Sequence, residues 1–213
     1  KNYIFFFFFG KKFNGEKFIK EAVKKRASVV VCSKSCKIKD NSILIIKTNK
    51  IRHLLSDVAS KFYKLKPKNI IAVTGTNGKT SVSDLFYQIL RINNIRVASI
   101  GTLGIKYNDK IIKTNLTSPD TITLHKNLNY LKNKKINNVI IEASSHGLDQ
   151  KRLHHIKFKG AIFTNFSQDH LDYHKTMKSY LSAKLILFRK ILRKNSTIIS
   201  NDKISTFKIL NQI

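Results

Sequence analysis

Residues 74–80 read Thr-Gly-Thr-Asn-Gly-Lys-Thr and stand between an apolar run, 70–73, and an amphipathic stretch. Two glycines in this segment would let backbone N–H groups turn toward phosphate oxygens, and a helix that begins here adds positive potential. Lys79 would reach the β- and γ-phosphates, and the Thr80 hydroxyl would bind Mg²⁺. A plain strand-to-helix turn seldom places Gly-Lys-Thr at this point. The motif therefore predicts an ATP-binding phosphate loop made of Gly75, Thr76, Asn77, Gly78, Lys79 and Thr80.

Three further polar segments, 142–152, 164–174 and 180–184, follow apolar runs. Ligand sites of open α/β sheets gather at the carboxyl ends of strands, so we expect these segments to approach the loop. Glu142 ends a buried apolar run, and a carboxylate there needs a partner such as Mg²⁺. A lone histidine is more often a surface residue or a hydrogen-bonded one. Because His170 follows a predicted strand and a phosphate loop is also present, we expect His170 to reach the same cavity as Glu142. Lys184 by itself would be a helix-surface lysine.

Beyond residue 68 the apolar pattern alternates between short strands and amphipathic helices. The predicted strands are 69–73, 96–99, 138–142, 160–164 and 197–200, and the predicted helices are 80–92, 121–134 and 176–192. This alternation is typical of the α/β class, here a central P-loop-type, mostly parallel sheet with helices on both faces.

The first third of the chain has a different pattern. We predict strands at 3–9, 28–32 and 42–46 and helices at 16–25 and 51–63. Residues 64–68, which include Pro67, form the best linker. The sequence therefore predicts two domains, part of a small α/β N-terminal domain at 1–66 and the central domain at 67–213.

The composition allows several readings of the charge. Lys and Arg number 41 against 12 Asp and Glu, a formal charge of +29. Nucleic-acid binding would explain this balance, but the lysines are spread along the chain and no basic helix or basic-aromatic platform stands out. We favour a compositional origin of the charge and expect no nucleic-acid partner.

No apolar run in the sequence approaches the roughly 20 residues of a membrane helix. Cys32 and Cys36 are expected to be unpaired thiols in a reducing cytosol.

The short form Gly-Thr-Asn-Gly-Lys-Thr, with Val73 where a general P-loop has its first glycine, resembles that of the Mur ligase superfamily. Residues 142–152 resemble the signature of the MurE type, and 164–174 are similar to the segment that follows it. Residues 116–120 look like its substrate loop, and 13–27 resemble the end of its N-terminal domain. The resemblance to MurE-type Mur ligases extends over essentially the whole chain.

This resemblance implies a cytoplasmic, monomeric, ADP-forming ligase that uses ATP and Mg²⁺. Such enzymes add a third amino acid, meso-diaminopimelate or L-lysine, to UDP-N-acetylmuramoyl-L-alanyl-D-glutamate through an acyl phosphate. It implies that CO₂ carbamylates Lys184, which then helps to hold a second Mg²⁺. The implied catalytic residues are Lys79, Lys184 and His170. The implied metal ligands are Thr80, Glu142, His170 and carbamylated Lys184. The implied substrate contacts are Thr117, Ser118, Ser144, Gln150 and Arg152.

Some features depart from the family pattern. We expect the sequence to lack the C-terminal ligase domain and the start of the N-terminal domain, and the chain alone to be inactive as a ligase. The five phenylalanines at 5–9 are also unusual for the family. Two alternatives remain: another superfamily member, such as MurF or a folylpolyglutamate synthase, or a non-catalytic nucleotide-binding or nucleic-acid-binding remnant.

Overall fold

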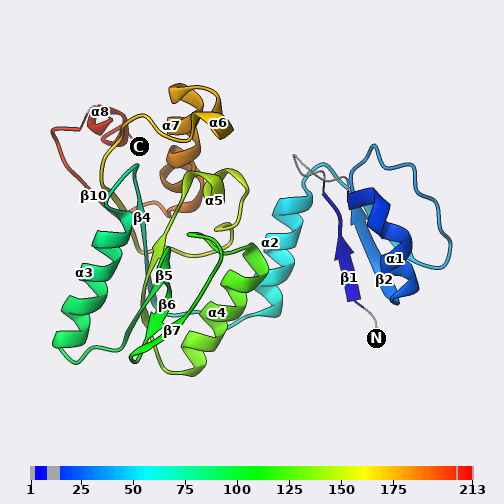
Figure 1. The fold of residues 1–213 in the computed structure, drawn as a ribbon, viewed down its shortest axis with the longest axis horizontal. Coiled ribbons are helices and arrows are strands. Elements are labelled where there is room, and N and C mark those ends of the chain that lie inside the picture. Colours follow the sequence, from blue (N-terminus) through cyan, green and yellow to red (C-terminus); the bar gives the residue numbers. More distant parts are fainter. Residues whose placement is uncertain (1–2, 9–14, 205, 213) are drawn as a thin grey trace. The chain divides into compact units, whose positions relative to one another are not determined.

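The computed structural model describes residues 3–8, 15–204 and 206–212 (Figure 1). The chain forms two compact units, residues 1–55 and 56–213. They divide inside helix α2 (Ile51–Phe62), earlier in the chain than the predicted domain boundary at residue 66. The predicted division into domains at 1–66 and 67–213 therefore stays a prediction.

The first unit contains a small parallel sheet with the strand order β1-β2-β3. Its strands are β1 (Tyr3–Phe6), β2 (Ala27–Cys32) and β3 (Leu44–Lys47), and a 3₁₀ turn (Gly15–Phe18) leads into α1 (Ile19–Lys24). The predicted strand 3–9 is shorter, since β1 ends at Phe6, and Phe9 lies outside the described residues. The predicted helix 16–25 begins later, because residues 15–18 form the 3₁₀ turn, on which Phe18 is 48% exposed. Cys32 and Cys36 are thiols, as expected, and both are buried.

The second unit is built on a seven-stranded sheet with the order β10-β9-β4-β8-β5-β6-β7. The strands from β10 to β5 are parallel, and β6 and β7 add an antiparallel edge. The bounds are β4 (Asn69–Thr74), β5 (Val97–Gly101), β6 (Gly104–Tyr107), β7 (Lys110–Ile112), β8 (Asn138–Glu142), β9 (Gly160–Phe163) and β10 (Thr197–Ser200). The mostly parallel α/β sheet is confirmed. The edge hairpin was not predicted, because its strands are short and exposed at β7.

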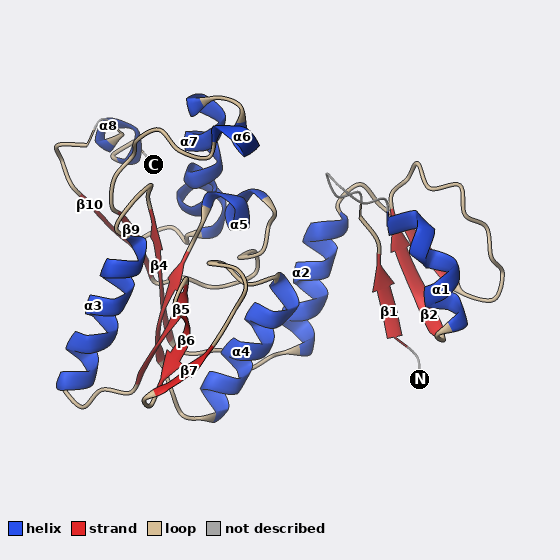
Figure 2. Cartoon of the chain, viewed as in Figure 1, coloured by secondary structure: helices blue, strands red, loops and turns tan. Residues whose placement is uncertain are grey.

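Helices lie on both faces of this sheet, as predicted, with α3 on one side and α4 on the other (Figure 2). The bounds are α3 (Lys79–Ile92), α4 (Thr121–Asn133), α5 (Ser145–Asp149), α6 (Leu171–His174), α7 (Met177–Ile186) and α8 (Phe207–Leu210). The predicted single helix 176–192 is wrong at its end, because α7 stops at Ile186 and a π-helical turn (Leu187–Ile191) follows. Leu187 and Phe188 are both buried on this turn. None of the described helices is long and apolar enough to cross a membrane.

The strand register determines where the polar segments meet. Val73 of β4 pairs with Glu142 of β8 on one side and with Ile162 of β9 on the other. Ile100 of β5 in turn pairs with Ile141 of β8. The carboxyl ends of these four strands are therefore level, and the residues that follow each strand share one edge of the sheet.

Candidate functional site

The loop between β4 and α3 has the backbone geometry of a tight phosphate-binding turn. Gly75 and Gly78 both have positive φ, 146° and 80°, which L side chains rarely adopt. A Cβ on Gly75 would also lie only 1.9 Å from Thr164 Oγ1. The helix begins at Lys79, directly after Gly78, so the free N–H groups of its first turn adjoin the loop.

Residues that follow β9 hold this loop in place. The Asn77 N–H donates to Asn165 Oδ1 (2.9 Å), and the Thr164 hydroxyl donates to the Asn77 carbonyl oxygen (2.6 Å). The Thr76 N–H donates to the Asn165 carbonyl oxygen (3.0 Å). Thr164 and Asn165 begin the segment 164–174, which was expected to approach the loop, although neither was named individually as a site residue. Their position immediately after a strand next to β4 was the available signal.

Glu142 is the buried anionic centre of the site, with a relative exposure of 1%. Its carboxylate accepts hydrogen bonds from the Thr80 hydroxyl (3.0 Å), the Thr102 hydroxyl (3.1 Å) and the Thr102 N–H (3.0 Å). A Cβ on Gly101 would lie 2.0 Å from Glu142 Oε1, so the absence of a side chain there makes room for the carboxylate. Gly101 and Thr102, at the end of β5, were missed from the sequence.

Two lysines contact the phosphate loop. Lys79 Nζ donates to the carbonyl oxygens of Thr76 (2.7 Å) and Gly75 (3.0 Å), and Lys184 Nζ donates to the same Gly75 oxygen (2.6 Å). Lys184 is 1% exposed and lies 4.4 Å above the Tyr180 ring, so its sequence-only placement on a helix surface is wrong. Burial, and then the Lys79 charge, lower the pKa of Lys184 to about 7. Burial also lowers the pKa of Lys79.

A pocket of about 250 Å³ brings several predicted residues together. Residues 76–80 line it, with Thr117, Ser144, His170 and Lys184. His170 has a left-handed φ of 53° at the start of α6, and its Nδ1 lies 3.4 Å from Asp169 Oδ1. Its ring is 4.9 Å from that of His146. The pocket is therefore a polar cavity at the carboxyl edge of the sheet, bounded by the phosphate loop.

Three predicted substrate contacts lie outside this pocket lining. Ser118 is buried, and its hydroxyl donates to the Glu142 carbonyl oxygen (2.8 Å) and lies 3.0 Å from Ser144 Oγ. Arg152 donates to the Ser118 carbonyl oxygen (2.7 Å) and to Gln150 Oε1 (2.6 Å). Ser118, Gln150 and Arg152 thus tie the loop before α4 to the segment after α5. Their contact with a substrate stays a prediction.

The oxygen atoms near the phosphate loop can be compared with the ligands that Mg²⁺ prefers. In the described part of the chain, no three His, Cys, Asp or Glu side chains form a group that could hold a metal by themselves. Thr80 Oγ1 and Glu142 Oε2 lie 3.0 Å apart at the phosphate loop. Mg²⁺ prefers hard oxygen ligands and usually takes only one or two from the protein, with water and phosphate oxygens completing its shell. These two residues therefore fit an ion that binds together with a nucleotide.

Comparison with known proteins identifies similar sequences. The family model described as the Mur ligase middle domain matches residues 73–212. A UDP-N-acetylmuramoyl-L-alanyl-D-glutamate–2,6-diaminopimelate ligase of Fusobacterium nucleatum is 40% identical over 204 residues, which cover 95% of this chain and 41% of the relative. The ligase of the same name from Rickettsia bellii is 41% identical over 203 residues, covering 92% and 42%. The chain spans about two fifths of the length of these relatives.

Solved structures show the same fold. A structure of UDP-N-acetylmuramoyl-L-alanyl-D-glutamate–2,6-diaminopimelate ligase matches all of this chain and 42% of its own, with a TM-score of 0.79 and 27% identity. The MurF ligase of Thermotoga maritima in complex with ADP matches all of this chain and 46% of its own, with a TM-score of 0.66 and 20% identity. At that lower identity the second match shows a common fold only.

We expect Gly101→Ala to destabilise the chain by about 1–3 kcal/mol, because the new methyl group would displace the buried Glu142 carboxylate. The measurement is the free energy of unfolding by urea. Glu142→Ala provides a matched background, since it removes the atoms that the methyl group would meet. There the cost of Gly101→Ala should fall below about 0.5 kcal/mol. An equal cost in both backgrounds would contradict this explanation of Gly101.

Proposed function

The chain belongs to the Mur ligase family, and we propose that it is the ATP-binding part of an ADP-forming acid–amino-acid ligase of peptidoglycan precursor synthesis. The acceptor would be UDP-N-acetylmuramoyl-L-alanyl-D-glutamate, and the names of the relatives favour 2,6-diaminopimelate over L-lysine as the added amino acid. The observation that carries this proposal is the convergence of the phosphate loop, the Thr80–Glu142 pair and Lys184 at one sheet edge.

The reaction needs a site that brings two anions together. In the first step the D-glutamate carboxylate attacks the ATP γ-phosphorus, giving an acyl phosphate and ADP. In the second, the amine of the incoming amino acid attacks the acyl carbon, and phosphate leaves. Lys79 and the N–H groups at the start of α3 would offset the negative charge of the triphosphate. Holding both reactants in one pocket would supply much of the remaining rate enhancement.

Thr80 and Glu142 would hold Mg²⁺ beside the β- and γ-phosphates, where the ion would neutralise developing charge. His170 and Lys184, in the same pocket, are our candidates for a second ion. For this, the neutral Lys184 amine would add to CO₂, form an N–C bond and lose one proton. Its burial and its lowered pKa, about 7, favour that neutral amine. The resulting carbamate would be an anion beside the Lys79 cation.

The remaining assignments concern the whole protein. Thr117 and Ser144, in the pocket wall, would contact the peptide portion of the acceptor. Arg152 could clamp a carboxylate or phosphate with its guanidinium fork. We further propose a UDP-side domain at 1–66, a central ATP-binding domain at 67–213, and a monomeric protein that acts in the cytoplasm.

We expect the purified chain to bind ATP only with Mg²⁺, and Lys79→Ala to weaken that binding about 10- to 100-fold. Loss of a hydrogen bond from a charged group costs about 1.5–3 kcal/mol, which corresponds to that range. Isothermal titration calorimetry measures the affinities, and circular dichroism verifies folding. Lys110→Ala, at an exposed lysine in β7, is the control and should bind as the parent does. Equal affinity of the parent and Lys79→Ala would refute ATP binding at this loop.

The carbamate gives a separate test. With ¹³C-bicarbonate, the ¹³C NMR spectrum should show a carbamate signal that Lys184→Arg lacks and that Lys203→Arg, at an exposed lysine, retains. The Lys184 amine is mostly protonated below its pKa of about 7, so the signal should be weak at pH 6 and strong at pH 8.5. A spectrum unchanged by Lys184→Arg would exclude this modification.

A further inference from the structure

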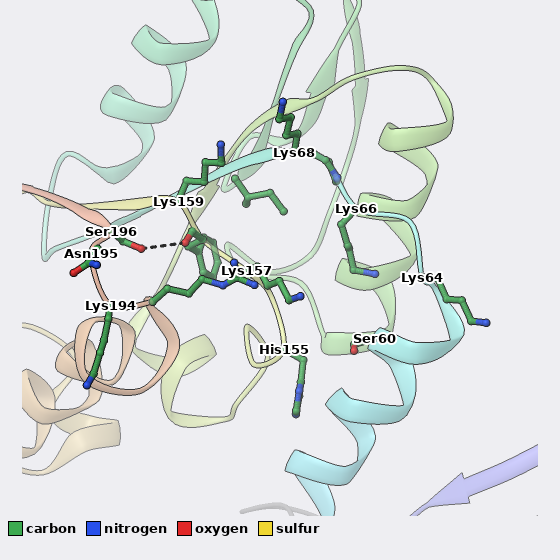
Figure 3. Close-up of a pocket in the computed structure, with 14 residues that line it drawn as sticks. Ser60, Lys64, Lys66, Lys68, His155, Lys157, Lys159, Lys194, Asn195 and Ser196 are labelled. Atoms are coloured by element: carbon green, nitrogen blue, oxygen red, sulfur yellow. Dashed lines mark hydrogen bonds between the residues drawn. The ribbon is translucent and has the colours of Figure 1, made fainter.

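A second pocket, of about 650 Å³, lies at the edge of the sheet opposite to the phosphate loop (Figure 3). Residues 64–68, 155–159 and 193–196 contribute most of its lining. These segments lead into β4, β9 and β10, which are parallel neighbours. Segments that precede parallel strands meet at the amino edge of a sheet, whereas the phosphate loop follows the carboxyl end of β4. The two pockets are therefore separate.

The lining of this amino-edge pocket is more basic than the chain as a whole. Seven of its fourteen residues are Lys or Arg and none is acidic, whereas Lys and Arg make up 41 of the 213 residues of the chain. Lysines that are spread along the sequence thus gather here in space.

Buried apolar residues flank several of these cations. In the segment before β9, the exposed Lys157 and Lys159 lie on either side of the buried Phe158. His155 precedes them in a turn and has a left-handed φ of 61°. In the segment before β4, Lys64 and Lys68 are exposed, Lys66 is half-buried and Pro67 is buried. The exposed lysines next to Phe158 and Pro67 therefore lie at the surface while their apolar neighbours pack inward.

One carboxylate from outside the lining lies near this pocket, since Asp57 Oδ1 is 3.9 Å from Nδ1 of the lining residue His155. None of the salt bridges among the described residues involves a Lys or Arg of this pocket. Burial lowers the pKa of Lys66 to about 8, so its charged form is already disfavoured. A bound anion would be attracted by these cations.

The neutral groups around the pocket narrow the choice of anion. Ser60 and Asn195 add side-chain donors of the kind that bind phosphate oxygens, whereas the Ser196 hydroxyl donates to the Phe158 carbonyl oxygen (3.5 Å; Figure 3). The lining contains one aromatic ring of Phe or Tyr, Phe158, and it is 1% exposed. A nucleobase would therefore find no stacking platform of this kind. The volume suits a small molecule.

We propose that the amino-edge pocket binds a compact ligand carrying several phosphate groups, such as an inorganic oligophosphate or a phosphorylated lipid headgroup. The site is independent of the ATP pocket. Residues of three loops supply its charge, and the ligand is recognised through its phosphates alone.

The test uses inorganic tripolyphosphate and the full chain in a Lys79→Ala background, which weakens binding at the phosphate loop. Calorimetry at low salt compares Lys157→Glu/Lys159→Glu with Lys110→Glu/Lys203→Glu, which changes the net charge equally at exposed lysines outside the pocket. We expect the pocket variant to lose at least about tenfold in affinity, the control less than about threefold, and Lys157→Arg/Lys159→Arg to bind as the parent does. Thermal unfolding verifies that each variant is folded.

Two further probes identify the source of the phosphate. Vesicles containing phosphatidylinositol bisphosphate, whose headgroup carries several phosphates, that bind the parent but not the pocket variant would support the proposal with a lipid headgroup as ligand. Absence of binding to both phosphate probes, or equal losses in the pocket and control variants, would overturn it. Tighter, pocket-dependent binding of single-stranded DNA than of either phosphate probe would also overturn it, in favour of a nucleic acid.

Discussion

The buried carboxylate of Glu142 is the constraint on which the site depends. An unpaired charge at the end of a core strand would be very costly, so its neighbours must supply donors. Thr80 at the start of α3 and Thr102 after β5 do so, and each belongs to a different segment of the chain. The carboxylate therefore links the phosphate loop to two strands of the sheet. Gly101 is required beside it because a side chain would occupy the same space.

Two lysines lie near this carboxylate at the phosphate loop. Lys79 and Lys184 both donate to the Gly75 carbonyl oxygen, and burial lowers the pKa of each. A nucleotide triphosphate with Mg²⁺ would restore the balance, which agrees with the chemistry of the Mur ligase family. The amino edge of the same sheet has cations without a carboxylate in the lining. The two pockets thus differ in chemistry, because the carboxyl edge combines lysines with the Glu142 carboxylate, whereas the described lining of the amino-edge pocket contains no carboxylate.

The sequence predicted the parts of the site that depend on local pattern. The phosphate loop has a local motif, and Glu142 ends an apolar strand, so the sequence singled out both, and the structure brings them together at one edge of the sheet. The burial of Lys184 was not, because it arises from packing of α7 against the loop and leaves no mark in the periodicity. Thr102 and Asn165 were missed for a related reason: short polar residues after a strand become partners only through the register of neighbouring strands. The π-helical turn after Ile186 keeps the apolar pattern of a helix and cannot be recognised from it.

A crystal structure of the chain with Mg²⁺ and a non-hydrolysable ATP analogue is the most direct test of the account. We expect the β- and γ-phosphates to lie against the N–H groups of residues 75–80. An Mg²⁺ ion should lie about 2.1 Å from Thr80 Oγ1, with Glu142 bound to it directly or through one water molecule. A nucleotide bound elsewhere, or phosphates in the loop with no metal near Thr80 and Glu142, would contradict the central claim that this carboxylate and the loop form one ATP site.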